Sequence, residues 1–495
     1  MKKKRNYVEM ITSKWTVFAV QLIVSMILLG LIFKLNVLPT KFFMILVAVI
    51  ALLLLLLLLM CYALMSVSKK RKKKKQPTGR IIFGKVLSLL LSICLAFGSI
   101  YLAKTNSTLD AIGGANTQTH TYALYVKADS SVEEVSQLTN PKVGVNLMTD
   151  TDNMNTAISE LKGEVAGVST TEFNDFNELA EGLYSGKVKA ILVNQAYLAL
   201  LEEEHEKFQS ETKVIWTFDI DEELQDIAKE VNVTNSPFVV FLSGIDTVGK
   251  VSTVSRSDVN MLVTINPNTR QILMTSIPRD YYVTLPNKGK KDKLTHAGLA
   301  GIENSVKALE GLLDIDVNYY GKVNFTSVTK IVNALGGVTV NSPYSFTTFD
   351  GVRITKGENY LNGSKALSFV RERHNLPNGD NDRVHNQQLL LQGMIEKAIS
   401  PSILANYNGV LNAISGAFET NMATSDITSL IKMQLNEGGG WEILQTQLTG
   451  TGKTMTGGAY MPGSKLYYMI PNEQSVKENS DLIKKVMNNE KIALN

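Results

Sequence analysis

Five arginines in the second half of the chain lie near aspartates, in a pattern that suits the binding of phosphate. The arginines are Arg256, Arg279, Arg371, Arg373 and Arg383, and the aspartates are Asp246, Asp258, Asp280 and Asp380. A guanidinium group donates paired hydrogen bonds that match phosphate oxygens, and carboxylates can hold a magnesium ion against the same phosphate. The residue types therefore predict a site that handles phosphate groups.

Arg279 lies in the stretch Ser276–Asp280, directly after a proline and an expected strand at Gln271–Ser276. Proline fixes its own φ and lacks a backbone donor, so we expect Arg279 to be held at the end of that strand. Asp246 follows a second expected strand, Phe238–Leu242, and Asp258 comes twelve residues later. Ligands bind at the carboxyl ends of strands in open α/β sheets. The two aspartates are therefore candidate magnesium ligands, and the alternative is that each only caps a loop.

Three further arginines fall in two expected helices. Arg371 and Arg373 are two residues apart and diverge by about 200° on a helix, so they meet one ligand only in a strand or at a helix end. Arg383 and Gln387 are four apart and share a helix face. Asp380 precedes them near the helix N-terminus, which favours anions. The alternative for each arginine is an exposed salt bridge worth less than about 1 kcal/mol.

Three apolar runs near the N-terminus predict membrane helices. They cover Trp15–Phe33, Phe42–Val67 and Ile81–Ala103. About 20 apolar residues span a bilayer, and the alternative for each run is a buried core helix. The basic run Lys69–Lys75 lies between the second and third helices, and positive charge favours the cytoplasmic side. A multi-pass protein follows, with a cytoplasmic N-terminus and everything after Ala103 outside the cell.

The rest of the chain predicts two α/β domains. Strand-like and helix-like runs alternate from His120 to Phe218, which indicates a small parallel α/β domain. A second α/β pattern begins at Pro237. The predicted division is 1–104 for the cytoplasmic N-terminus and membrane helices, 105–225 for an accessory domain, and 236–495 for the domain with the arginines and a C-terminal extension.

Composition excludes several other classes of protein. The net charge of +4 over 495 residues does not indicate a nucleic-acid partner, and Cys61 and Cys94 form neither a disulfide framework nor a metal motif. No glycine-rich nucleotide loop with its lysine is present. Outside a bacterial membrane there is no pool of ATP or GTP. A phosphoryl transfer there needs a donor with its own high-energy bond, and a lipid-linked pyrophosphate in the same membrane meets that need.

Seven motifs in fixed order resemble the LytR–CpsA–Psr family, and within it the capsule-associated members of streptococci. They are SGID with Asp246, RSD with Arg256 and Asp258, SIPRD with Arg279, KLTHA at Lys293–Ala297, LGGV at Leu335–Val338, RER at Arg371–Arg373, and GDNDRVHNQQ with Asp380, Arg383 and Gln387. The resemblance covers about Pro237–Ser400 and a tail. With the membrane helices and the accessory domain it extends over nearly the whole chain, and it implies an α/β/α domain around a mixed central sheet.

The resemblance implies a magnesium-dependent phosphotransferase that ligates capsular polysaccharide from undecaprenyl pyrophosphate to peptidoglycan. By motif, Asp246 and Asp258 would hold Mg²⁺. The pyrophosphate would be bound by Arg256, Arg279, Arg371, Arg373, Arg383 and Gln387. Arg279, Asp258 and Asp380 would be catalytic, with Asp380 as the general base. The lipid tail would lie in an apolar cavity of the same domain. Asn386 departs from the family pattern, which often has arginine there, so one possible phosphate contact is missing.

Two other functions fit the same residues. The chain could bind a polyprenyl pyrophosphate or hydrolyse it without an acceptor. It could also regulate capsule biosynthesis or transcription, with Lys69–Lys75 contacting nucleic acid, but the predicted topology places the arginines on the opposite side of the membrane from that run.

Overall fold

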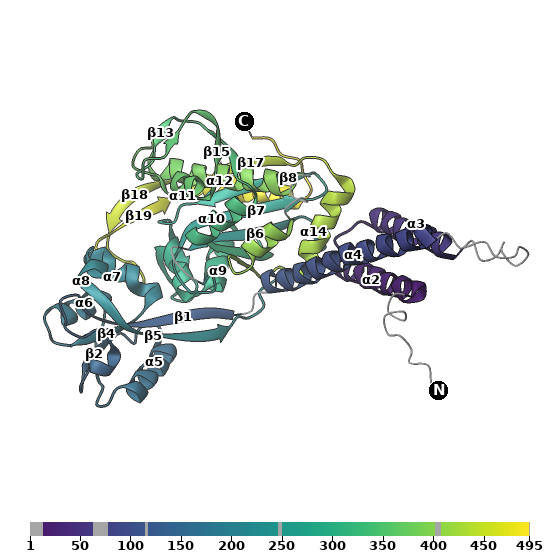
Figure 1. Ribbon diagram of the computed structural model, residues 1–495. Coiled ribbons are helices and arrows are strands. Elements are labelled where there is room, and N and C mark those ends of the chain that lie inside the picture. Colours follow the sequence, from purple (N-terminus) through teal and green to yellow (C-terminus); the bar gives the residue numbers. More distant parts are fainter. Residues whose placement is uncertain (1–12, 63–77, 114–116, 246–249, 401–406, 495) are drawn as a thin grey trace, which may run out of the picture. The chain divides into compact units, whose positions relative to one another are not determined.

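The computed structural model describes residues 13–62, 78–113, 117–245, 250–400 and 407–494 (Figure 1). It divides into two compact units. The N-terminal helices and residues 423–439 form the first, and the described residues of 112–422 and 440–495 form the second.

The first unit contains three long apolar helices: α2 (Lys14–Leu35), α3 (Thr40–Tyr62) and α4 (Thr78–Ile112). Each is long and apolar enough to cross a membrane, which confirms the three predicted helices. Residues 63–67 of the second predicted span lie outside the described residues. Large apolar side chains point outward, and that of Phe33 is 74% exposed. The polar groups turn inward instead, because lipid cannot satisfy them. The Ser88 hydroxyl donates to the Gln21 side-chain oxygen and joins α4 to α2.

A fourth helix of this unit comes from far along the chain. It is α14 (Thr424–Glu437). The Lys432 ammonium donates to Asn36 Oδ1 at 2.8 Å, and the Lys41 ammonium donates to the carbonyl oxygen of Asn436 at 3.0 Å. Asn36 ends α2 in a left-handed conformation, with φ of 51°. The start of α3 and the turn before it therefore lie against α14.

The second unit contains two mixed sheets. The accessory sheet has the strand order β3-β2-β4-β1-β5. Its strands are β1 (Thr117–Lys127), β2 (Lys142–Val145), β3 (Ser169–Glu172), β4 (Ala190–Asn194) and β5 (Thr212–Glu223). Its helices are α5 (Thr151–Glu164), α6 (Phe176–Tyr184), α7 (Leu198–Glu204) and α8 (Phe208–Glu211).

The prediction of an all-parallel accessory sheet was wrong for one strand. Strands β2, β3 and β4 are parallel, but β1 runs antiparallel to both β4 and β5. The segment between β1 and β2 contains only the 3₁₀ turn Val135–Gln137 and no crossover helix, so these two strands of the sheet run in opposite directions. The long β1–β5 pair extends from Thr117↔Glu223 to Lys127↔Thr212 (Figure 1).

The central sheet has the order β16-β11-β6-β7-β8-β17. Its strands are β6 (Phe238–Ile245), β7 (Ser257–Asn266), β8 (Gln271–Ile277), β11 (Tyr319–Asn324), β16 (Phe418–Thr420) and β17 (Glu442–Gln447). Strands β7 and β8 form an antiparallel hairpin. The Asn266 side chain closes it by accepting from the amides of Asn268 and Thr269.

Helices cover both faces of the central sheet. Along β7, Met261 and Val263 pack with Leu391 and Ile395 of α12 (Asp380–Ala398), while Leu262 faces the other core cluster. That second cluster includes Leu309 of α9 (Ile302–Leu313) and Ile483 of α15 (Glu473–Met487). The alternation follows from the two-residue period of a strand. It gives the predicted α/β/α layers, so the predicted fold class is confirmed, while the predicted domain boundaries stay predictions.

Four small strand pairs and three more helices complete this unit. The pairs are β9 (Tyr282–Leu285) with β10 (Lys290–Lys293), β12 (Val338–Ser342) with β15 (Gly357–Leu361), β13 (Phe346–Thr347) with β14 (Arg353–Ile354), and β18 (Gly450–Met455) with β19 (Leu466–Pro471). The helices are α10 (Phe325–Ala334), α11 (Gly363–Arg371) and α13 (Tyr407–Ile414).

Candidate anion-binding site

One edge of the central sheet collects the predicted site residues. Strand β7 is antiparallel to β6 and β8, so its first residues lie beside their last ones. The pairs Ser257↔Ile245 and Asn260↔Ile277 mark this edge. Asp258 lies near the start of β7 at this edge, and Arg279 follows the end of β8 at the same edge. The sheet thus places two residues that are distant in sequence at its carboxyl-terminal edge, where ligands bind in this class of fold.

A β-bulge directs Asp258. Gly244 pairs with Val259, but the next residue, Ile245, pairs with Ser257, so Asp258 has no partner on β6. Bulges of this kind turn one side chain out of the strand pattern and are frequent beside active sites. Only glycine fits at position 244, because an added Cβ would lie 2.7 Å from the Val259 Cβ. The glycine of SGID therefore lets the two strands approach where the bulge forms.

Asp258 is the centre of a network of ion pairs. Arg279 Nη1 lies 3.2 Å from Asp258 Oδ2, and Arg256 Nε lies 3.5 Å from Oδ1. The hydroxyl of Thr295 donates to Oδ1 at 3.4 Å. Arg279 Nε also lies 3.7 Å from Asp280 Oδ2. The Asp258 side chain is 10% exposed, so these contacts offset a largely buried charge.

Helix α12 brings Asp380 and Arg383 to the same network. It begins after Gly379, whose φ is +57°. Arg383 Nη2 lies 2.8 Å from Asp380 Oδ1. The side chain of Gln388 donates to the carbonyl oxygen of Thr446 at 2.7 Å, which ties the helix to β17. The N-terminal turn of α12 therefore lies at the carboxyl edge of the sheet, where the positive end of the helix dipole favours an anion.

The charges of this cluster act on one another. Burial lowers the pKa of Arg279, but the carboxylates of Asp258, Asp280 and Asp380 outweigh it, and the net pKa is raised. Burial and the positive charges of Arg279 and Arg373 lower the pKa of Arg383. The carboxylates of Asp380 and Asp258 raise it by less, so the net pKa is lowered. Burial also raises the pKa of Asp280. The cluster therefore holds several arginines whose mutual repulsion an anion would relieve.

Two guanidinium nitrogens in the cluster lack acceptors. Arg279 Nε and Arg383 Nε are buried and make no hydrogen bond within the described part of the chain. Buried donors are almost always paired in folded proteins. A bound phosphate would supply oxygens to both, so the arrangement suits an anion with several acceptor atoms.

The other predicted ligands are placed differently. Arg371 lies over the rings of Phe325 and Phe349, at 4.8 and 5.7 Å from its guanidinium carbon to the ring centres. Phe325 follows β11 at the same sheet edge, but no described ion pair joins Arg371 to Asp258 or Asp380. The positive charge of Arg373 lowers the pKa of Arg383, so Arg373 lies near the cluster. Gln387 is half-buried one turn after Arg383. The predicted metal ligand Asp246 lies outside the described residues.

Sequence reasoning gave no role to Glu372, which lies between the two arginines of RER. It is fully buried. Its carboxylate accepts from the backbone amides of Phe349, Arg373 and Asn375 at 2.5 to 3.0 Å. These bonds hold the turn that follows α11, between Arg371 and Arg373. The signal for this role that the sequence offered was the position of an acidic residue between two arginines.

The KLTHA segment supports the same site. Lys293 Nζ lies 3.9 Å from Asp280 Oδ1. The amide of Thr295 donates to the carbonyl oxygen of Arg279 at 2.9 Å. His296 Nδ1 lies 2.9 Å from Asp292 Oδ1, and both side chains are buried. The motif was recognised in the sequence, but its roles depend on contacts with SIPRD that no local pattern reveals.

Asn386, which departs from the family pattern, has a packing role. It is 2% exposed, and its side-chain amide donates to the carbonyl oxygen of Phe369 at 3.3 Å. This bond fixes α11 against α12. The residue therefore contacts protein and not the anion site.

The donor chemistry around Asp258 fits a magnesium ion. A carboxylate has about four lone-pair positions, and the described contacts of Asp258 use three neighbouring groups. Magnesium prefers oxygen ligands and is usually held by one or two carboxylates together with substrate phosphates. Among the described residues no group of three or more His, Cys, Asp or Glu side chains gathers as a metal site. Phosphate oxygens would therefore have to complete the coordination.

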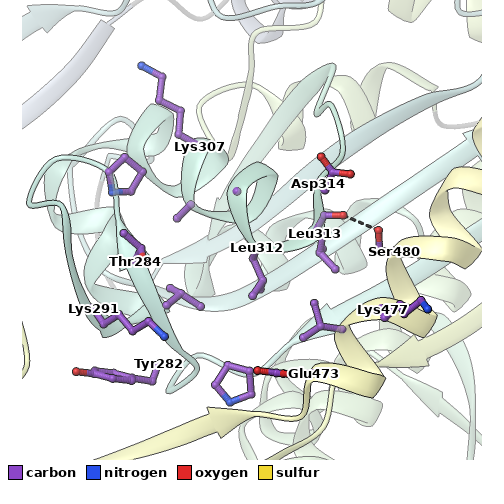
Figure 2. A pocket seen from close by; sticks show the side chains of 16 residues that line it. Tyr282, Thr284, Lys291, Lys307, Leu312, Leu313, Asp314, Glu473, Lys477 and Ser480 are labelled. Carbon is purple, nitrogen blue, oxygen red and sulfur yellow. Dashed lines mark hydrogen bonds between the residues drawn. The ribbon is translucent and has the colours of Figure 1, made fainter.

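A separate groove lies beside β9, α9 and α15 (Figure 2). Its volume is about 560 Å³, and the labelled side chains that line it include Tyr282, Lys291, Lys307, Leu312 and Lys477. The predicted pyrophosphate ligands are not among its lining residues. The groove is thus distinct from the arginine cluster.

Comparisons with known proteins agree with the motifs. Residues 195–485 match the LytR_cpsA_psr family. A teichoic acid transferase TagU of Enterococcus faecalis, named as a polyisoprenyl-teichoic acid–peptidoglycan enzyme, is 36% identical over 235 residues, which are 47% of this chain and 76% of that protein. TagU of Bacillus subtilis is 32% identical over 252 residues, covering 50% and 78%.

A solved structure was also matched. The crystal structure of B. subtilis TagU is 30% identical, covers 53% of this chain and 100% of that one, and has a TM-score of 0.41. The expected likeness to capsule-associated members in particular stays a prediction, because these relatives are named for teichoic acid. From the motifs and the family match together, the chain belongs to the LytR–CpsA–Psr family.

Proposed function

We propose that this protein is a membrane-anchored phosphotransferase that moves a glycopolymer from a polyisoprenyl diphosphate carrier to peptidoglycan. The convergence of Arg279 and Arg383 with Asp258 and Asp380 carries the proposal. Support also comes from family membership and from relatives named as polyisoprenyl-teichoic acid–peptidoglycan transferases.

The transfer joins an acceptor sugar hydroxyl to the phosphorus that bears the glycopolymer. A new O–P bond forms, the P–O bond to the polyprenyl phosphate breaks, and the hydroxyl proton goes to a base. Asp380 is the proposed base, and its side chain is 36% exposed, which leaves it open to an acceptor. The arginines offset the charge that develops on the transferring group and on the leaving phosphate.

Magnesium is the proposed metal, held by Asp258 and by Asp246, which follows β6 in the sequence and lies outside the described residues. When bound, it would neutralise phosphate charge and orient the diphosphate. Arg279 and Arg256 hold the Asp258 carboxylate in place. Within this proposal, the described residues bind and orient the diphosphate whether or not the metal is present.

We also propose that the N-terminus is cytoplasmic and the α/β domains are outside. The contacts Lys432–Asn36 and Lys41–Asn436 support the number of crossings and not the choice of side. They require α14 and the turn between α2 and α3 to lie on one side of the membrane, and a chain that starts inside reaches the outside at that turn. The basic run Lys69–Lys75 then falls inside, as the positive-inside rule requires.

The identity of the glycopolymer is a finer part of the proposal. The resemblance to capsule-associated members favours capsular polysaccharide, while the relatives' names favour teichoic acid. Both share the polyisoprenyl diphosphate that the arginine cluster is proposed to bind. Transfer of each purified lipid-linked polymer by the same preparation distinguishes the two.

A binding or pyrophosphatase role is the second candidate, because the same cluster would serve it. The test is a reaction with the purified full chain, a lipid-linked glycopolymer, Mg²⁺, and peptidoglycan present or absent. We expect a covalent product only with peptidoglycan. Release of polyprenyl phosphate at the same rate without an acceptor would contradict the transferase and favour the pyrophosphatase.

A further inference from the structure

We propose that the accessory sheet positions the diphosphate site, with Glu203 as the positioning residue acting through Lys293, and with Thr119 bracing the strand that leads to Arg256. The inference rests on the proposed function, since it gives the accessory domain a part in that same site. It does not assign any direct contact with substrate to the accessory residues.

The first link is a partly buried ion pair between Lys293 and Glu203. Lys293 Nζ lies 2.6 Å from Glu203 Oε1 on α7 and 3.9 Å from Asp280 Oδ1. The Lys293 side chain is 7% exposed, and its ammonium lies over the ring of Tyr468. A buried ammonium needs its partners, because water is not available to replace them. Glu203 therefore determines where the Lys293 charge sits, and Lys293 in turn faces the carboxylate next to Arg279.

The second link is a pair of backbone hydrogen bonds. The amide of Thr119 on β1 donates to the carbonyl oxygen of Ser252 at 3.0 Å, and the amide of Val254 donates to the carbonyl oxygen of Thr119 at 2.8 Å. The Thr119 hydroxyl also meets the Ser252 hydroxyl at 2.9 Å. The accessory strand thus adds a short ladder to residues 252–254. Arg256 and the bulged Asp258 follow immediately.

A third observation makes the two sheets one body. A single hydrophobic cluster contains Tyr197 and Leu201 of the accessory part as well as Leu294 and Tyr460 of the central part. The rings of Tyr197 and Tyr460 lie 5.9 Å apart, and the Tyr460 amide donates to Asp292. A continuous packed core transmits displacement because it has little free volume. Both links therefore act on a rigid base.

The two links reach different members of the ion pair between Arg279 and Asp258 at the centre of the site. Glu203 leads through Lys293 to Asp280, which adjoins Arg279. Thr119 leads through Ser252–Val254 to Arg256 and Asp258. An accessory domain that only bound a separate partner would not need contacts at both positions.

The test uses the full chain in detergent with three variants. Glu203→Gln removes the charge at constant shape, Glu203→Asp keeps the charge one methylene shorter, and Glu204→Gln is the matched control on the same helix. Farnesyl diphosphate serves as a soluble isoprenyl diphosphate probe. Hydrogen–deuterium exchange of residues 250–258 and 278–282 serves as a readout independent of activity. Thermal unfolding checks that each variant is folded.

We expect Glu203→Gln to weaken farnesyl diphosphate binding by about fivefold or more, as for a typical coupling between sites, and to speed exchange in both segments. Glu203→Asp should recover part of each effect, and Glu204→Gln should match the wild type. Equal binding and equal exchange in Glu203→Gln and Glu204→Gln would overturn the inference. If the wild type does not bind the probe but Glu203→Gln still speeds exchange, the positioning stands and the proposed function fails.

Discussion

Arg279 Nη1 lies 3.2 Å from Asp258 Oδ2, and the side chains of Arg279 and Asp258 are 21% and 10% exposed. The pair joins the end of one strand to the bulged start of its antiparallel neighbour. The two charges offset each other, and among the described residues Arg279 Nε has no hydrogen-bond acceptor. A diphosphate would therefore find an arginine already oriented, with one donor unused.

Replacing Arg279 by lysine should abolish most transfer while the protein stays folded. Lysine keeps the charge but cannot donate two parallel hydrogen bonds, and a lost donor to a transition state costs about 10² to 10³ in rate. The rate is measured with a purified lipid-linked donor and peptidoglycan. Arg353→Lys, on an exposed strand of the same unit, is the control. A near-normal rate for Arg279→Lys would count against the site.

Removal of magnesium should stop transfer, and added Mg²⁺ should restore it. Asp258→Asn should need a higher Mg²⁺ concentration, because an amide oxygen is a weaker ligand than a carboxylate. The measurement is the transfer rate during Mg²⁺ titration after chelation. Asp316→Asn, an exposed carboxylate paired with Lys229, is the control. Full activity in chelator would exclude the metal from the proposed reaction.

Gly244→Ala should destabilise the second unit and disturb the bulge at Asp258. The new Cβ would lie 2.7 Å from the Val259 Cβ, and overpacking of this kind costs about 1 to 3 kcal/mol. Gly311→Ala is the matched control, because its Cβ meets nothing within 4 Å on α9. In a helix that change favours folding by about 0.5 to 1 kcal/mol. Thermal unfolding of the two variants should therefore shift in opposite directions, and parallel shifts would contradict the close approach.

Lys322→Met should destabilise the protein more than Lys322→Met combined with Glu419→Gln. The two residues face each other across β11 and β16, and Lys322 is 5% exposed. Burial lowers the pKa of Lys322 and raises that of Glu419. Loss of one member of a buried pair costs about 3 to 5 kcal/mol, whereas loss of both is often neutral.

The difference between these two variants should shrink at low pH. A raised carboxyl pKa means that the folded state holds the proton more tightly than the unfolded state does. The contribution of Glu419 to stability is then fully present below pH 4.5, the usual pKa of a glutamate, and is lost as the pH rises through the pKa of the folded state. Unfolding temperatures measured from about pH 7 down to about pH 4.5 check this. A gap independent of pH would place the cause elsewhere.

Cysteines placed at Asn36 and Lys432 should both react with a membrane-impermeant maleimide on intact cells. The two side chains are hydrogen-bonded at 2.8 Å, so they must lie on one side of the membrane. Replacement of Cys61 and Cys94 provides the unlabelled background. Labelling only after lysis would reverse the proposed orientation, and labelling of one cysteine alone would contradict the contact.

The sequence by itself determined the element types and the chemistry available. Apolar runs of membrane-spanning length, alternating strands such as Met261–Val263, and an arginine held after Pro278 are local properties. They depend on the length and the period of a pattern within a few residues. The prediction that arginines and aspartates at strand ends and at a helix start form one site followed from the same rules. The structure places Asp258, Arg279, Asp380 and Arg383 near one another, and their roles stay predictions.

Only the tertiary structure decided which side chains meet. A bulge sets the position of Asp258, Arg371 lies over aromatic rings, and Glu372 accepts hydrogen bonds from backbone amides in the turn after α11. The antiparallel course of β1 and the contact of Glu203 with Lys293 were likewise invisible beforehand. Each depends on strand register and on packing between segments far apart in the chain, and no local pattern encodes these relationships.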